Sequence, residues 1–139
     1  CKWTLATGGV RRLEGHRDWV AALQAGPGWL ASGAWDGEIR LWDLASDACL
    51  RSLCGHADAV YALALAPGLL LSGSRDCTVR AWDPASGQCV GIAPRVHVSA
   101  VSGLAARGAA VYAASWDRSL RRPPPPAPTP PPRGGGRAD

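Results

Sequence analysis

The chain has 139 residues, 47% of them hydrophobic and 19% charged, and no apolar run approaches the about 18 residues that a membrane-spanning helix needs. Its formal net charge is +4, but +3 of that charge falls in the last 19 residues, so the rest of the chain offers no basic face for nucleic acid. The composition therefore argues against both a membrane and a nucleic acid as partner.

The sequence repeats itself at an offset of 40 residues. When residues 10–49 are laid over residues 50–89, 20 of the 40 positions are identical. Repeats of this length are typical of modular folds, in which one unit cannot bury its own apolar face and stacks on copies of itself.

Each unit contains four short segments with β-strand patterning and turn signals between them. The first unit predicts strands at 20–23, 29–32, 38–42 and 49–53, and the second predicts strands at 60–65, 69–72, 78–82 and 89–93. The third unit predicts a strand at 111–114 and a following strand that ends near 122. At the other end of the chain, 3–4 is expected to be the tail of a preceding unit's third strand and 10–13 the fourth strand of that unit. Four antiparallel strands in about 40 residues is the size of one propeller blade, and no helix longer than one turn is expected.

Two dipeptides recur at fixed spacing in both full units. Gly15-His16 and Gly55-His56 stand near the start of each unit, and Trp42-Asp43 and Trp82-Asp83 follow later in the unit. With this pattern the chain resembles the WD-repeat family of β-propellers from Trp3 to about Arg122. The resemblance implies an all-β fold, a partial β-propeller of four-stranded antiparallel blades, followed here by a disordered Pro/Gly-rich C-terminal tail.

The resemblance also implies one hydrogen-bonded tetrad of side chains in each full unit. The members by position are His16, Ser32, Asp36 and Trp42, then His56, Ser72, Asp76 and Trp82. A buried carboxylate needs hydrogen-bond donors, and an imidazole, a hydroxyl and an indole supply them. A nucleophilic serine needs exposure and an oxyanion hole, whereas these serines lie inside strands and recur once per unit, so we expect a structural role and no enzyme activity.

The five cysteines form an odd set without a C-x-x-C pair. Cys49 and Cys89 occupy the same position in successive units, which indicates small buried hydrophobic side chains rather than disulfide partners. We therefore expect a reducing, intracellular location in the cytoplasm or nucleus. A zinc site built from Cys49, Cys54, His56 and Cys89 is the weaker interpretation, because zinc sites usually pair their cysteines closely. We expect neither a metal nor another cofactor.

The third unit begins in register and then departs from the pattern. Ala113 stands where Ser72 stood, and Pro123-Pro124 replace Trp-Asp. Proline cannot donate to a β-ladder, so the repeat region should end near Arg122. The predicted domains are 1–122, with units of about 10–49, 50–89 and 90–122, and a Pro/Gly/Arg-rich tail at 123–139.

Two full and two partial units cannot close into a ring. We expect a sector of a longer propeller or a truncated product, with assembly of several copies as the alternative. Further blades, in the same or another chain, are therefore expected partners.

Positions that differ between the units hold residue types that are enriched at protein interfaces. They are Trp19, Trp35, Tyr61, Arg75 and Trp116. In the WD-repeat family such positions project onto one rim of the propeller and contact partners. The alternatives are that the tryptophans cover gaps between blades, or that Trp35, Tyr61 and Trp116 form an aromatic cage for a methylated lysine.

We therefore predict a non-catalytic interaction scaffold that presents this aromatic and arginine rim to a protein or peptide. One alternative is a truncated product whose tail acts as an SH3-type ligand, through Arg122-x-x-Pro125-x-x-Pro128 or Pro128-x-x-Pro131-x-Arg133. The other is the substrate-receptor part of a ubiquitin ligase.

Overall fold

The computed structural model describes residues 2–3, 8–94, 96–123 and 127–128, and every regular element within them is a β-strand. None of these residues belongs to a helix long and apolar enough to cross a membrane. The all-β prediction is confirmed.

The strands form antiparallel sheets, which we call blades. The first blade is β3 (Val20–Gly26), β4 (Trp29–Ala34), β5 (Ile39–Asp43) and β6 (Cys49–Leu53), in that spatial order. The second blade is β7 (Val60–Ala66), β8 (Leu69–Ser74), β9 (Val79–Trp82) and β10 (Cys89–Ala93), with β14 (Ala127–Pro128) added beside β10. The third blade is β11 (Val101–Arg107), β12 (Ala110–Ser115) and β13 (Leu120–Arg121), and β1 (Lys2–Trp3) pairs with β2 (Val10–Arg11).

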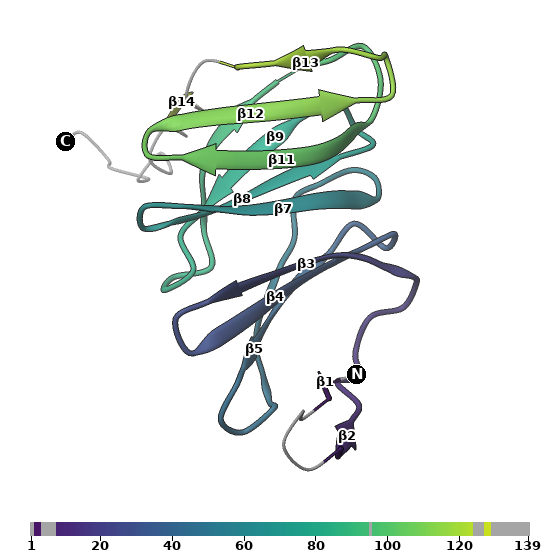
Figure 1. Ribbon diagram of the computed structural model, residues 1–139, viewed down its shortest axis with the longest axis vertical. Helices are drawn as coiled ribbons and strands as arrows, with labels where there is room; N and C mark the ends of the chain where they lie inside the picture. The colour runs from purple at the N-terminus through teal and green to yellow at the C-terminus, as the bar shows by residue number, and fades with distance from the viewer. Residues whose placement is uncertain (1, 4–7, 95, 124–126, 129–139) are drawn as a thin grey trace, which may run out of the picture.

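The three blades stack face to face along the long axis of the molecule, with the first strands β3, β7 and β11 following one another (Figure 1). A glycine on the second strand of one blade faces the valine that opens the next. A Cβ on Gly33 would lie 2.6 Å from a methyl carbon of Val60, and a Cβ on Gly73 would lie 2.6 Å from a methyl carbon of Val101. Close packing of successive blades therefore requires glycine at both positions.

The hydrophobic core lies between the blades rather than within one sheet. One cluster joins the first and second blades, and two join the second and third. The first comprises Ala31, Ile39, Leu41, Leu53, Val60, Leu63, Leu70 and Trp82. The others are centred on Val79, Ala93, Val96, Val101 and Ala113, and on Ala64, Leu71, Ala81 and Val111.

The predicted strands of the two full units are present, and their first and second strands run one to three residues further than expected. They extend because each hairpin ladder continues to its turn, as in the pairing of Gly26 with Trp29 and of Ala66 with Leu69. In the preceding partial unit, the strand predicted at 10–13 is limited to Val10–Arg11, and the one predicted at 3–4 is Lys2–Trp3, with residue 4 outside the described residues. The tail differs in one place, since Ala127–Pro128 pairs with β10, a strand edge that carries no charge to repel it. The rest of the predicted tail, 124–126 and 129–139, lies outside the described residues.

Candidate functional site

In each full blade the structure places the four tetrad side chains in one hydrogen-bonded row. In the second blade the indole Nε1 of Trp82 donates to Ser72 Oγ at 2.8 Å, Ser72 Oγ lies 2.6 Å from His56 Nε2, and His56 Nδ1 lies 2.8 Å from Asp76. The first blade repeats the row with corresponding distances of 2.8, 2.7 and 3.1 Å. Each row is satisfied when the serine hydroxyl donates to the histidine and Nδ1–H donates to the aspartate.

The tetrad aspartates are held ionised. Burial alone would raise the pKa of Asp76, but hydrogen bonds from His56 and Thr78 outweigh it and place the pKa well below the usual value. The pKa of Asp36 is lowered in the same way, against the effect of burial, by backbone N–H groups of Glu38 and Arg17 and by His16. Each carboxylate therefore ties its hairpin turn to the segment that precedes the first strand.

The third blade retains the histidine and the aspartate without the serine and the tryptophan. His97 Nδ1 lies 3.0 Å from Asp117, and its Nε2 lies 3.0 Å from the carbonyl oxygen of Ala113, which takes the place of a serine hydroxyl. A side-chain hydrogen bond from Ser119 is the main cause that lowers the pKa of Asp117, to about 2. The carbonyl oxygen can only accept, so His97 Nε2 donates to it, and Ser119 adds a hydroxyl donor to Asp117.

The hairpin turns lie against the starts of the first strands, at one end of the blades. The backbone N–H of Trp35 donates to the carbonyl of Trp19 at 2.9 Å, and the same bond joins Arg75 to Ala59 and Trp116 to Ala100. This bond brings residue 35 beside residue 19 within one blade.

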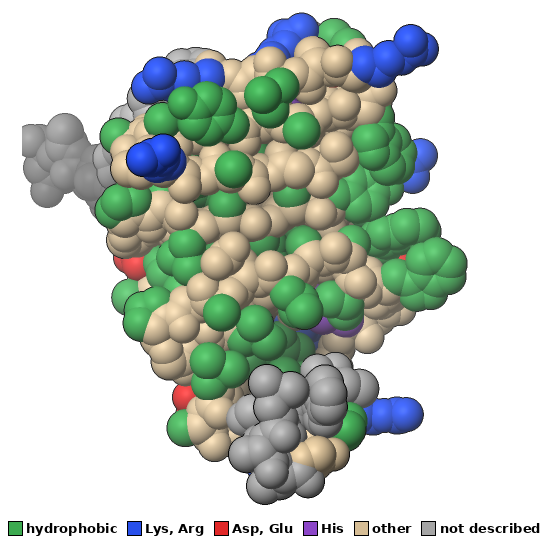
Figure 2. Space-filling model, viewed as in Figure 1, with side chains coloured by type: hydrophobic (Ala, Val, Ile, Leu, Met, Phe, Trp, Pro, Cys, Tyr) green, Lys and Arg blue, Asp and Glu red, His purple; other side chains and the backbone are tan. Residues whose placement is uncertain are grey.

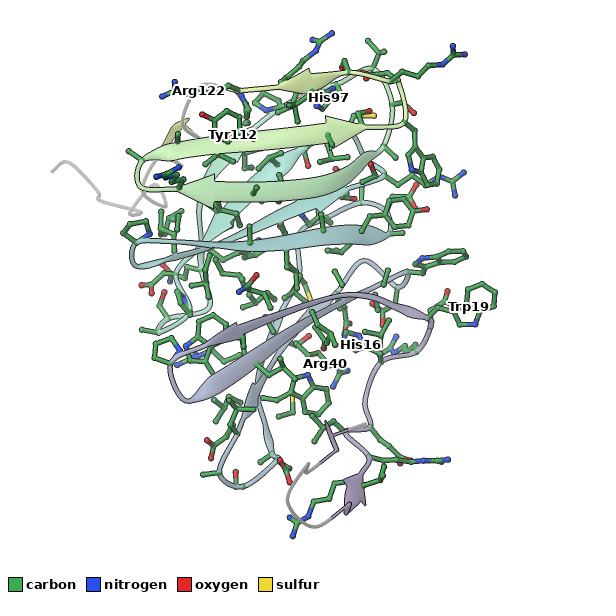
Figure 3. All side chains as sticks on the ribbon, viewed as in Figure 1. His16, Trp19, Arg40, His97, Tyr112 and Arg122 are labelled. Atoms are coloured by element: carbon green, nitrogen blue, oxygen red, sulfur yellow. The ribbon has the colours of Figure 1, made fainter. Side chains whose placement is uncertain are left out.

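Four of the five predicted rim residues form a continuous row of rings, which we call the aromatic ladder: Trp19, Trp35, Tyr61 and Trp116. The centroids of Trp19 and Trp35 are 4.7 Å apart, Trp35 meets Tyr61 edge-on at 6.2 Å, and Tyr61 stacks on Trp116 at 5.2 Å. Side chains of the first, second and third blades thus join one surface. Figure 3 shows Trp19 projecting from the right-hand side of the molecule, with Tyr112 on the left, and Figure 2 shows hydrophobic side chains gathered along that right-hand side.

The three tryptophans of the ladder are largely exposed to solvent. The exposed fractions are 70% for Trp19, 43% for Trp35 and 60% for Trp116. They therefore do not act as buried fillers between blades. The rings also leave no open cage, because Tyr61 and Trp116 stack too closely for an ammonium group to lie between them.

Arg75, the fifth predicted rim residue, has an exposed side chain whose Nε lies 3.9 Å from Asp58. Surface pairs of this length contribute little energy, so the guanidinium remains available to a partner. Asp58 also accepts the backbone N–H of Ala59 at 2.8 Å, as Asp18 accepts that of Trp19. Residues 18 and 58 are both aspartate and occupy the same position in the two units. This shared position was the sequence signal for the two hydrogen bonds, and the sequence analysis did not use it.

The described part of the chain holds no group of three or more His, Cys, Asp or Glu side chains placed to bind a metal. Cys49 and Cys89 take the same place in their blades, each on the fourth strand and paired with a tetrad tryptophan of the third strand, Trp42 or Trp82.

Comparison with known proteins fits this geometry. The family model described as "WD domain, G-beta repeat" (WD40) matches residues 7–43 and 47–83. The chain belongs to the WD40-repeat family. Proteins of this family are generally non-catalytic scaffolds that bind proteins or peptides.

Two groups of similar proteins place the chain further. It resembles the crystal structure of the RRP9 WD40 repeats with a TM-score of 0.76 and 30% identity, over 81% of this chain and 37% of that one. It is 46% identical over 41 residues to ribosome biogenesis protein BOP1 of Rattus norvegicus and of Homo sapiens, which is 28% of this chain and 6% of each relative. The WD40 chain thus spans well under half the length of each of these relatives.

Proposed function

We propose that this WD40 chain is a sector of a propeller that binds a protein or peptide through the aromatic ladder and Arg75. The single observation that carries the proposal is the continuity of the ladder, in which rings from three blades touch in series while their tryptophans stay exposed. Rigid indole rings lose little conformational entropy on binding, and Trp, Tyr and Arg dominate interface energetics.

The second element of the proposal is that another blade covers the free face of the first blade. Val60 and Leu63 are 0% and 8% exposed beneath the first blade, whereas their counterparts Val20 and Leu23 are 51% and 63% exposed. The exposed pair lines a hollow together with Leu13, Leu30 and Trp42. A blade that offers a glycine and apolar side chains, as the first blade offers Gly33 and Leu41 to the second, fits this face.

The intracellular location predicted from the cysteines stays a prediction. Cys89 is partly buried against the core, which supports a packing role for this thiol, whereas Cys49 at the matching place is exposed and does not pack in that way.

The proposal is tested by alanine at Trp35 and Arg75, which lie on turns outside the tetrads. Either change should weaken a bound partner by about 1 to 4 kcal/mol and leave the β-sheet circular dichroism unchanged. The matched control is Tyr112→Ala, since Tyr112 is an exposed aromatic residue on β12, away from the rim. Equal affinities for all three variants and the unaltered chain would reject the rim as the binding surface.

A further inference from the structure

The outer strands of the first and second blades differ although they occupy the same place. β6 is the last strand of its sheet among the described residues, whereas β10 has β14 beyond it. The register equates Arg51 with Gly91, because Arg51 pairs with Leu41 of β5 and Gly91 pairs with Ala81 of β9. The same register equates Ser52 with Ile92.

The edge of β6 carries the features that block strand pairing. Arg51 is exposed, and its guanidinium donates to the carbonyl of Ser86 in the next blade at 3.2 Å. A charged side chain on an edge strand opposes the addition of another strand. The outer edge of β6 therefore carries a charge that opposes pairing with another strand.

The outer edge of β10 carries no such charge. Its five residues, Cys-Val-Gly-Ile-Ala, carry no charge, and Gly91 presents no side chain to an opposing strand. An uncharged edge of this kind is a template for another strand, including the same edge of a second copy of the chain.

Two residues of the chain's own proline-rich segment, Ala127 and Pro128, already lie against this edge. β14 pairs with β10 in antiparallel register, Gly91 opposite Pro128 and Ile92 opposite Ala127. Because Pro128 has no N–H, the hydrogen-bonded pair of this ladder is Ile92 with Ala127.

The composition of the segment suits it to end a sheet. Eight of the ten residues from 123 to 132 are proline, so Ala127 and Thr129 are its two possible backbone donors. A strand of this kind can cover one edge but leaves too few donors on its far side for a further strand to pair.

We propose that the outer edge of β10 is a strand-addition site and that the proline-rich segment around residues 127–128 of the same chain is its occupant, which keeps a second copy from pairing there. The site is separate from the aromatic ladder. Its test therefore stands apart from the test of the proposed function.

The experiment measures hydrogen exchange of individual backbone amides by NMR in the full chain. Ala127→Pro removes the Ala127 N–H, one of the two donors of the pair with Ile92, and so weakens the pairing of β14 with β10. Ala127→Ser keeps that N–H and serves as the matched control. We expect the amide of Ile92 to exchange at least about fivefold faster in Ala127→Pro than in Ala127→Ser, the factor that corresponds to one net hydrogen bond. The amide of Ser52, at the same register in β6, should not change.

Sedimentation of the same proteins tests the protective role. Ala127→Pro should associate at lower concentration than the unaltered chain, and adding Gly91→Arg, which gives β10 the charge that β6 has, should reverse this. Unchanged exchange at Ile92, an equal rise at Ser52, or association that Gly91→Arg leaves intact would each overturn the proposal. Association of the unaltered chain that Gly91→Arg abolishes would also overturn it, since a second copy would then be the occupant.

Discussion

Replacing Ser72 by alanine probes the tetrad most sharply, because one hydroxyl connects two buried groups. Ser72 and Trp82 are fully buried, and Ser72 Oγ lies within hydrogen-bond distance of both the Trp82 indole and His56. Without the hydroxyl the indole N–H has no acceptor, which costs about 1 to 3 kcal/mol. His56 Nε2 would lose the hydroxyl that donates to it, with a similar cost, unless the ring finds another donor.

The loss at the indole alone amounts to about 2 kcal/mol, so we expect Ser72→Ala to lower the free energy of unfolding by at least that amount. Urea unfolding followed by tryptophan fluorescence measures this change from the midpoint at constant m-value.

A double-mutant cycle with Trp82→Phe, which removes the indole N–H, isolates the shared bond. The double variant should cost less than the sum of the two single variants, by about 1 kcal/mol. Ser52→Ala, at an exposed serine of β6, is the control and should stay within about 0.5 kcal/mol of the unaltered chain. A cost at Ser72 no larger than that at Ser52, or full additivity with Trp82→Phe, would refute the account of the tetrad.

Three further outcomes are expected. Leu63→Ala should cost about 2 to 5 kcal/mol by urea unfolding, whereas Leu23→Ala at the equivalent exposed position should cost under about 0.5 kcal/mol, and equal costs would show that the two faces are packed alike. Cys77 holds a left-handed turn conformation (φ 70°) where the first blade has Gly37 (φ 81°), so Cys77→Gly should raise the melting temperature, and a fall would contradict strain at this turn. Because the pKa of Asp117 is lowered to about 2, the contribution of this carboxylate to stability is complete above the unfolded pKa of about 3.9 and is lost as pH falls toward 2. Asp117→Asn should therefore reduce the dependence of the free energy of unfolding on pH between these two values. A pH dependence equal to that of the unaltered chain would exclude a contribution from the lowered pKa.

The fold class could be predicted from the sequence because two units repeat in register and apolar residues occupy alternate positions along their strands. Contacts among the rings of the aromatic ladder were harder to predict. The approach of Trp19 to Trp35 depends on a backbone hydrogen bond between the two residues, and the stacking of Tyr61 on Trp116 depends on the spacing of the second and third blades. Neither quantity is encoded in a local pattern.

Two further features could not be predicted from the sequence. The carbonyl of Ala113 replaces a side-chain partner of His97, and a main-chain group cannot be identified from residue type. The pairing of Ala127–Pro128 with β10 contradicts the ordinary expectation for a proline-rich segment, because it depends on an edge 35 residues away that lacks a charge.

The central claim is that partners bind at the aromatic ladder, and site-specific photo-crosslinking tests it most directly. A photoreactive amino acid is placed at Trp35 in one full-length protein and at Tyr112 in another, two aromatic positions of nearly equal exposure at 43% and 39%. The account predicts that one partner crosslinks in cells at position 35, not at 112, and that Arg75→Ala lowers its yield while Ser52→Ala does not. Crosslinking of the same partner at position 112 alone, or a yield at 35 that Arg75→Ala leaves unchanged, would contradict it.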